Sequence, residues 1–146
     1  MSIQWQGREE TIWIIPDRLF GLQFLDRPKG KDTRYFAVEY DRGSMPVTRS
    51  NLHQSSYLRK FVGYASTYRQ QLHRKHLGVE FFYVLNVTTS IERVDNLIET
   101  YQAEALLHPS SFLFTPKLRK PSIDGFEDVL AMTWRNGAGN IVSLPS

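Results

Sequence analysis

The stretch that decides the fold of this chain is VEFFYVLNV, at residues 79–87. It is apolar almost throughout, rich in β-branched and aromatic side chains, and bounded by Gly78 and Thr88. A run of this kind is typical of a central strand that is covered on both faces, as happens in parallel and mixed sheets. We therefore predict that residues 79–87 lie in the middle of a sheet.

Helices are predicted on either side of this strand. Over residues 56–76 the apolar side chains recur at helical spacing. A second apolar stripe runs over residues 91–105 and follows Thr89 and Glu92, whose spacing matches a helix-capping box. A strand placed between two amphipathic helices indicates a sheet that helices cover.

Two strand-like segments precede the first helix and form a predicted hairpin. Residues 11–24 indicate one or two strands interrupted at Pro16, which lacks an amide hydrogen and therefore belongs at a strand start or edge. Residues 26–32 have the composition of a turn, and residues 34–41 return as a strand.

Two further strands are predicted at residues 112–115 and 129–134. The complete order of strand, hairpin, helix, strand, helix, strand and strand predicts an α/β fold with a mixed β-sheet flanked by helices. At 146 residues, 41% of them hydrophobic, the chain is long enough to bury a core as a single domain over residues 1–146.

The composition limits the classes of function. The chain contains no cysteine, which excludes a disulfide scaffold and a thiolate zinc site and agrees with a reducing, cytoplasmic location. No apolar run approaches the roughly 20 residues that a membrane helix needs, so we expect no membrane partner. The net charge of +3 and the isoelectric point near 9.3 favour encounter with polyanions without identifying one.

Three acidic side chains, Asp17, Glu39 and Asp41, lie near the open end of the predicted hairpin, away from its turn. Residues two apart in a strand point to the same face, so Glu39 and Asp41 project together, and hairpin pairing brings Asp17 near Glu39. Mg²⁺ or Mn²⁺ best accounts for such a cluster, because both ions take hard oxygen ligands. The alternative is that the acids pair with Arg18 and Arg42. A metal at this place indicates phosphodiester chemistry.

The motifs along the chain occur in a specific order. They are Pro16-Asp17-x-x-Phe20, Val38-Glu39-x-Asp41-Arg42-Gly43-Ser44-Met45-Pro46, Val84-Leu85-x-Val87-Thr88-Thr89-Ser90 with Asn96-Leu97, Phe112-Leu113-Phe114-Thr115, and Trp134. This order resembles the replication-relaxation family, whose members are encoded by plasmids and integrative elements. The resemblance runs from about Ile14 to Trp134 and covers most of the chain.

The resemblance implies a PD-(D/E)XK architecture, which is a restriction-endonuclease-like core whose hairpin holds metal-binding carboxylates. Asp17 would bridge the metal, Glu39 would be a second ligand, and Asp41 would be a third ligand or an orienting acid. The lysine expected two residues after the strand acid is Asp41 here, so a cation has to come from elsewhere, and Lys60 on the following helix is the best substitute. The winged-helix region that often precedes the motif in this family is also missing.

A phosphate backbone would require basic side chains near the acids. Residues 55–76 contain no acid and carry a basic set: Arg59, Lys60, Arg69, Arg74 and Lys75. A second basic cluster follows residue 116: Lys117, Arg119 and Lys120. We expect DNA contacts from Arg42, Arg59, Arg69 and Arg74. A solvated surface is the alternative for the helix and the favoured interpretation for the second cluster.

Two functions fit these patterns. The first is a DNA-acting protein of a mobile element that works with other replication or mobilisation proteins. Its Mg²⁺- or Mn²⁺-dependent endonuclease-like site would consist of Asp17, Glu39, Asp41 and Lys60. The second is a non-catalytic DNA-binding or protein-interaction module on the same fold. Loss of the usual lysine favours the second function, whereas retention of all three acids favours the first.

The two neighbouring histidines, His73 and His76, have a spacing that can bind metal. No third ligand is in view in the sequence, so we interpret them as surface groups at a helix end, where the helix dipole favours positive charge.

Overall fold

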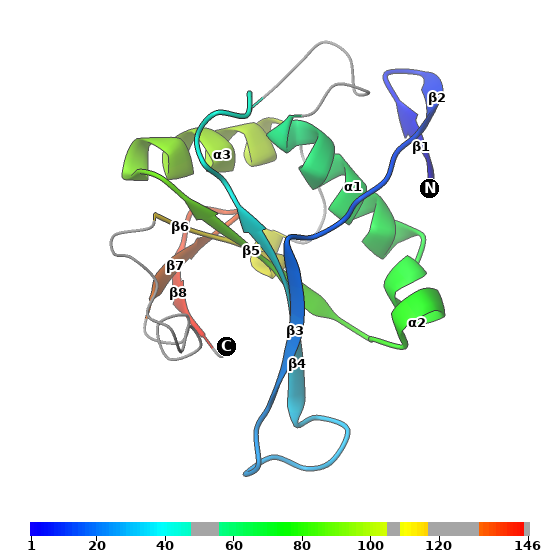
Figure 1. The fold of residues 1–146 in the computed structure, drawn as a ribbon, viewed down its shortest axis with the longest axis vertical. Coiled ribbons are helices and arrows are strands. Elements are labelled where there is room, and N and C mark those ends of the chain that lie inside the picture. Colours follow the sequence, from blue (N-terminus) through cyan, green and yellow to red (C-terminus); the bar gives the residue numbers. More distant parts are fainter. Residues whose placement is uncertain (48–55, 105–108, 117–131, 145–146) are drawn as a thin grey trace.

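The described residues form a mixed sheet of six strands with helices on one face (Figure 1). A computed structural model describes residues 1–47, 56–104, 109–116 and 132–144. In spatial order the strands are β3 (Arg18–Gln23), β4 (Thr33–Tyr40), β5 (Phe82–Thr88), β6 (Phe112–Pro116), β7 (Thr133–Asn136) and β8 (Ile141–Ser143). β4, β5 and β6 run parallel, and the other neighbours are antiparallel. The α/β class and the mixed sheet predicted from the sequence are confirmed.

β5 is the central strand that its sequence predicts, although it begins at Phe82 rather than at Val79. Val84 and Leu85 point to opposite faces of the sheet, and both are fully buried. The strand is therefore covered on both sides, which explains why its apolar run is continuous rather than alternating.

The helices α1 (Tyr57–Arg69) and α3 (Ile91–Ala103) pack on one face of the sheet, and α2 (Leu72–Leu77) lies beyond the end of α1 (Figure 1). Phe61 of α1 is central to this packing, because its ring meets those of Tyr101, Phe112 and Phe114 edge-on. Such edge-to-face pairs contribute about 0.5–1.5 kcal/mol each beyond the area that they bury. Both helices are thereby fixed against the sheet.

The single helix predicted over residues 56–76 is wrong, since the chain divides it into α1 and α2. Gln71 adopts the left-handed backbone conformation, with a φ of 55°, and this breaks the helix. The predicted capping box of α3 is displaced by one residue, because the side chain of Ser90, and not of Thr89, accepts the N–H of Arg93. None of the described helices is long and apolar enough to cross a membrane.

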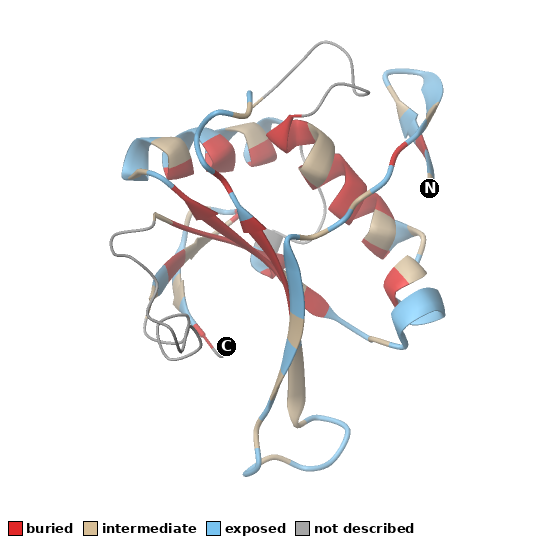
Figure 2. Ribbon diagram, viewed as in Figure 1, coloured by how far each residue is buried: buried red, intermediate tan, exposed pale blue. Residues whose placement is uncertain are grey.

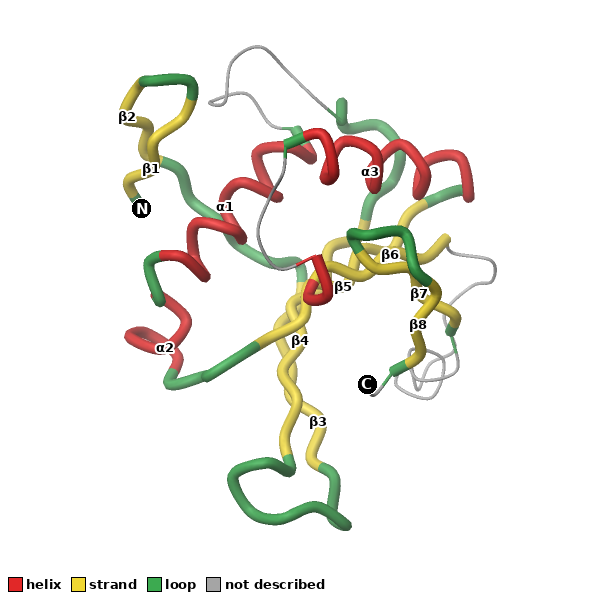
Figure 3. The backbone as a smooth tube through the Cα atoms, turned by 180° about the vertical axis from the view of Figure 1, so that it is seen from behind, coloured by secondary structure: helices red, strands yellow, loops and turns green. Residues whose placement is uncertain are grey.

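A hairpin that the sequence patterns do not predict precedes the sheet. β1 (Ser2–Trp5) and β2 (Arg8–Thr11) pair through a two-residue turn in which both residues have positive φ. The hairpin lies beside α1 (Figure 3). Four buried residues make this contact: Ile3, Ile12, Leu58 and Val62. The chain then passes along α1 before it enters β3 (Figure 1).

The opposite face of the sheet carries a second core, which α1, α2 and α3 do not cover. Its buried members are Phe36, Val38, Leu85, Val87, Leu113, Trp134 and Leu144. Within the sheet, Figure 2 shows that burial is concentrated in β5, β6 and the half of β4 nearest the helices. The predicted strand at 129–134 overlaps β7 only at its end, because residues 129–131 lie outside the described residues, and β8 is not predicted.

The β3–β4 hairpin extends well beyond the helices, so its turn lies at one end of the molecule (Figure 1). The other end of β4 lies beside α1 and next to β5. Among the described strands β3 pairs with β4 alone, which makes it the edge strand of this sheet. The carboxyl end of β4 therefore lies between the edge strand β3 and the central strand β5.

Candidate functional site

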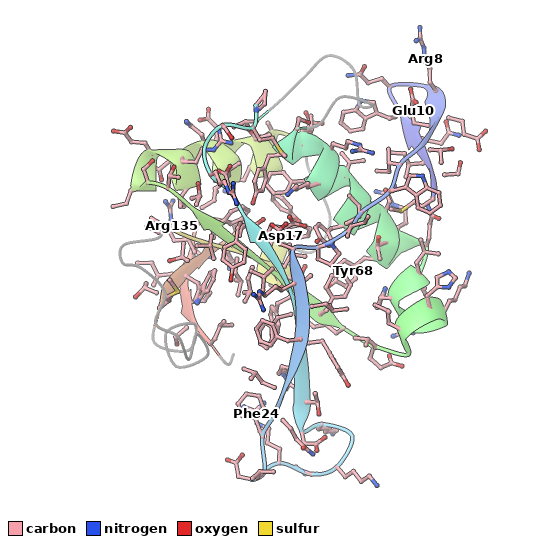
Figure 4. The ribbon with its side chains drawn as sticks, viewed as in Figure 1. Arg8, Glu10, Asp17, Phe24, Tyr68 and Arg135 are labelled. Atoms are coloured by element: carbon pink, nitrogen blue, oxygen red, sulfur yellow. The ribbon has the colours of Figure 1, made fainter. Side chains whose placement is uncertain are left out.

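Asp17 lies at the start of β3, beside the carboxyl end of β4 (Figure 4). Its Oδ2 atom accepts the backbone N–H of Tyr40 at 2.8 Å. Its Oδ1 atom makes no hydrogen bond within the part of the chain that the structure describes. The hairpin therefore brings Asp17 to the residue that follows Glu39, which is the proximity that the sequence predicts.

Glu39 is buried between β4 and α1, with only 1% of its surface exposed. Its Oε2 atom accepts a hydrogen bond from Lys60 Nζ at 2.5 Å, and its Oε1 atom accepts one from the Tyr64 hydroxyl at 2.5 Å. Lys60 and Tyr64 lie one helical turn apart and so reach the same carboxylate. The structure thus brings to Glu39 the lysine that the sequence offers as the substitute cation.

Burial sets the electrostatics of Glu39. It raises the pKa of the carboxyl, because the charged form loses its water, and the nearby Asp17 charge raises that pKa further. Hydrogen bonds from Lys60 and Tyr64 lower the pKa without cancelling the effect of burial. Burial and the charge of Glu39 also raise the pKa of Tyr64, so its hydroxyl remains a donor. Burial thus disfavours the charged form of Glu39 by more than its two hydrogen bonds favour it.

Asp41 follows β4 and is held by four hydrogen bonds. Arg93 of α3 donates from Nε to Oδ2 at 2.6 Å and from Nη2 to Oδ1 at 3.2 Å. Thr88 donates its hydroxyl to Oδ2 and Gly43 its N–H to Oδ1. Burial alone would raise the pKa of Asp41, but the hydrogen bonds from Arg93 and Thr88 outweigh it and lower that pKa. Arg93 also donates to the Met45 carbonyl, so the pair ties the loop after β4 to α3.

The three acids differ in how far hydrogen bonds occupy their oxygens. The four hydrogen bonds on Asp41 occupy the lone pairs of both its oxygens, so this residue does not fit as a metal ligand. Asp17 and Glu39 keep free lone pairs. Within the residues that the structure describes, no three acidic or histidine side chains are grouped to hold a metal. Mg²⁺ nevertheless commonly binds through one or two carboxylates, with water and phosphate oxygens completing its shell.

A crevice of about 750 Å³ lies beyond the carboxyl ends of β4 and β5. It is lined by Asp17, Arg18, Tyr40, Asp41, Arg42, Val87, Thr88 and Thr89. Glu39 and Lys60 do not line it, because they lie on the side of β4 that faces α1. Asp17 therefore stands at the border between the crevice and the Glu39–Lys60 pair. Ligands of open α/β sheets bind outside the carboxyl ends of strands in this way.

The alternative that the acids pair with Arg18 and Arg42 is wrong. The ion-pair partner of Glu39 is Lys60 and that of Asp41 is Arg93. Arg18 and Arg42 are exposed at the crevice, and neither forms an ion pair among the described residues. Both guanidinium groups are therefore available to an anionic ligand.

The basic helix expected beside the acids is divided. Arg59 is half-buried on α1, and its Nε atom is buried without a hydrogen-bond partner in the described part of the chain. Arg69 is exposed nine residues beyond Lys60, about 13 Å along the helix axis. Arg74 lies on α2 and pairs with Glu80 at 2.7 Å. The basic cluster at 117–120 lies outside the described residues. Arg42 is the expected DNA contact that lines the crevice.

No family model, curated protein or solved structure matches this chain. The geometry around Asp17, Glu39 and Lys60 is therefore the ground on which a function can be inferred.

Sequence reasoning does not assign three of the residues that build the site. The spacing of Tyr64 could have identified it, since it lies four residues after Lys60 on the same helix face. Arg93 and Thr88 carry no signal, because they reach Asp41 from 52 and 47 residues away in the sequence. The expectation that His73 is a surface group is wrong, since its ring is buried against Tyr68 and Phe82; His76 is exposed.

Proposed function

We propose that this protein acts on the DNA of a mobile element, as its resemblance to the replication-relaxation family implies, and that it cleaves phosphodiester bonds with the help of Mg²⁺ or Mn²⁺. The site consists of Asp17, Glu39 and Lys60. The β3–β4 hairpin, α1 and β5 form the restriction-endonuclease-like core of this proposal. The protein works in the cytoplasm with other replication or mobilisation proteins.

The observation that carries the proposal is the buried contact between Glu39 and Lys60, next to Asp17. The Glu39 carboxylate is 1% exposed and its pKa is raised, so its burial costs free energy of folding. A buried charge that does not stabilise the fold indicates a role in function. Buried carboxylates whose pKa is shifted gather at functional sites. The Lys60 side chain is 23% exposed, so it joins the buried acid to the surface of the protein.

Each residue of the proposed site has a separate role in the reaction. Mg²⁺ or Mn²⁺ at such a site polarises the scissile phosphate and lowers the pKa of the attacking water. Asp17 and Glu39 would hold the cation through the lone pairs that their hydrogen bonds leave free. Lys60 stabilises negative charge that develops on the phosphate, because it supplies the positive charge that Asp41 cannot. Tyr64 fixes the orientation of Glu39, and Asp41 with Arg93 fixes the end of β4.

A second candidate is a non-catalytic DNA-binding or protein-interaction module on the same fold. The saturation of Asp41 by Arg93 favours it, because an internal ion pair occupies the position where a typical nuclease of this architecture has its lysine. Such a module would use Arg18 and Arg42 to bind phosphates and would leave the acids without a catalytic role.

The test is nicking of supercoiled plasmid in Mn²⁺, read as the open-circle fraction. We expect Lys60→Met and Glu39→Gln to lose at least about 100-fold in rate, since one removed electrostatic stabiliser costs about 10²–10³. Mn²⁺ should raise the thermal midpoint of the wild type and of Lys60→Met by mass action, but not that of Glu39→Gln. Lys29→Met, at the turn of the β3–β4 hairpin, is the matched control and should nick normally.

Each remaining result decides between the candidates. Nicking that survives in Lys60→Met but not in Glu39→Gln keeps the nuclease and removes the role of Lys60. A wild type that binds Mn²⁺ and DNA but nicks neither duplex nor single strands establishes the non-catalytic module. A thermal midpoint that does not change with Mn²⁺ or with EDTA removes the metal site.

A further inference from the structure

Tyr40 is the last residue of β4, and its side chain leaves the core at the crevice. Side chains alternate along a strand, so Tyr40 points away from the helices that Glu39 faces. Phe36 and Val38, on the same face of β4, are 0% and 4% exposed, whereas Tyr40 is 50% exposed. Neither its ring nor its hydroxyl contacts another aromatic or polar group among the described residues. This aromatic ring therefore presents an uncovered surface to the crevice.

The groups around Tyr40 combine three chemistries in one hollow. Arg18 and Arg42 supply two exposed guanidinium groups, and no acid of the described residues pairs with either. Val87, which is 9% exposed, supplies an apolar wall. The volume of about 750 Å³ lies within the range of pockets that hold small ligands. An aromatic face, an apolar wall and paired cations together match a nucleotide, with its base on the ring and its phosphates on the arginines.

We propose that Tyr40 is a stacking platform for an unpaired base, so that the crevice takes a single-stranded segment of DNA rather than an intact duplex. A base inside a duplex is covered on both faces by its neighbours, whereas an unpaired base can stack on a side chain. Arg18 and Arg42 bind the phosphates on either side of this base. The inference rests on the proposed action on DNA and adds the class of substrate.

The backbone connects this platform to the proposed metal site. The N–H of Tyr40 donates to Asp17, so the residue that stacks the base also holds a carboxylate that binds the cation. A base on the Tyr40 ring would place a neighbouring phosphodiester next to Asp17. The preference for unpaired DNA and the position of cleavage would thus be set by the same residue.

The test measures the affinity of a fluorescent 12-nucleotide single strand and of the matching blunt duplex over a range of salt concentrations, in EDTA so that nothing is cut. We expect the wild type to prefer the single strand. Tyr40→Ala and Tyr40→Leu should lower single-strand affinity about tenfold or more and leave duplex affinity and the salt slope unchanged. Tyr40→Phe and Tyr40→Trp should keep the preference, because they keep an aromatic face.

Two further variants complete the test. Arg18→Ala with Arg42→Ala should weaken both substrates and lower the salt slope by about two, since two phosphate contacts are lost. Tyr35→Ala is the matched control: this tyrosine of β4 is 37% exposed, lies outside the crevice, and should leave both affinities unchanged.

The failures are distinguishable. If Tyr40→Ala and Tyr40→Leu leave the single-strand preference intact, or if the wild type binds both substrates equally, the stacking platform is wrong and the action on DNA stands. If the wild type binds neither substrate at any salt concentration, the proposed function and the platform are both wrong. Thermal unfolding of each variant establishes that the fold is retained, and Tyr40→Leu decides if Tyr40→Ala does not fold.

Discussion

Glu39 is an almost fully buried carboxylate, and this makes it the residue whose substitution is most informative. Its ion pair with Lys60 and its hydrogen bond from Tyr64 do not offset the loss of hydration, so its pKa lies above the ordinary value of 4.5. Between the ordinary and the raised pKa the folded chain holds a proton that the unfolded chain has lost. The free energy of unfolding therefore falls as the pH rises through this interval.

We predict that Glu39→Gln, measured in EDTA by urea unfolding between pH 4 and pH 8, lacks this fall in stability. At neutral pH it should unfold with a free energy within about 1 kcal/mol of the wild type or above it, because the amide keeps an acceptor for Tyr64 without a buried charge. Glu39→Ala should cost about 2–3 kcal/mol, since it leaves the Tyr64 hydroxyl without its acceptor. If both variants lose the same free energy of unfolding at pH 7, the ion pair with Lys60 stabilises the fold by more than burial of the charge costs.

The residues of this site differ in how far the sequence reveals them. Asp17 and Glu39 follow from strand alternation and from one hairpin, which are local patterns. Lys60 is predicted because it lies on the helix that comes after β4 in the sequence and packs back against that strand. The partner of Asp41 does not follow, because Arg93 lies 52 residues away and reaches it only once α3 has packed on the sheet. Local patterns do not determine such long-range packing.

At the scale of elements, a glycine of α1 determines how closely the segment before β3 approaches. A Cβ atom on Gly63 would lie 2.2 Å from both Cγ1 and Cδ1 of Ile14, which is closer than carbon atoms can approach. Ile14 belongs to the segment that leads to Asp17. The close approach of this segment to α1 therefore helps to place the carboxylate of Asp17.

We predict that Gly63→Ala destabilises the protein by about 1 kcal/mol or more, although alanine is the better helix former by about 1 kcal/mol, because overpacking commonly costs about 1–3 kcal/mol. In an Ile14→Ala background the same substitution should stabilise, since the overlapping atoms are gone and Ile12 remains at an ordinary 3.4 Å. Urea unfolding of the four chains measures both effects. A stabilising Gly63→Ala in the unmodified chain would show that the segment moves aside at little cost.

The elements that sequence patterns reveal are those with strong periodicity. β5, α3 and the β3–β4 hairpin are predicted, because continuous apolar runs, helical stripes and turn residues mark them. The break between α1 and α2 is missed, since it falls at Gln71, a residue type with no preference for the left-handed backbone that it adopts. β1 and β2 are missed for another reason. Their alternation is short and depends on packing against α1, which single strands do not encode.

At the scale of the whole molecule, four arginines that are candidates for binding DNA lie in two separate groups. Arg18 and Arg42 flank the crevice, whereas Arg69 and Arg74 lie at the far end of α1 and on α2 (Figure 1). The separation of about 13 Å along α1 between Lys60 and Arg69 exceeds the distance of about 8 Å over which exposed charges act in physiological salt. Arg69 and Arg74 also do not line the crevice, so we expect DNA held there to be nearly independent of both.

We predict that charge reversal at Arg18 and Arg42 lowers affinity for a 12-nucleotide single strand by about tenfold or more, because two phosphate contacts become repulsive. The double reversal Arg69→Glu with Arg74→Glu should change the same affinity by less than about threefold. Fluorescence anisotropy at physiological salt compares the two variants with the wild type. The opposite order would place the DNA along α1 and α2, as the basic pattern of the sequence alone indicates.

The position of β3 at the sheet edge has a consequence for the opening of the molecule in solution. Protein segments open with free energies that are lowest at edges and ends, and highest in the centre. β3 can separate from β4 while β4 stays paired with β5, and this would free Asp17 from the Tyr40 N–H but leave Glu39 in place. The two acids thus belong to parts of the protein with different protection against local unfolding. Separation of β3 from β4 is enough to disrupt the site, and renewed pairing of the two strands is enough to restore it.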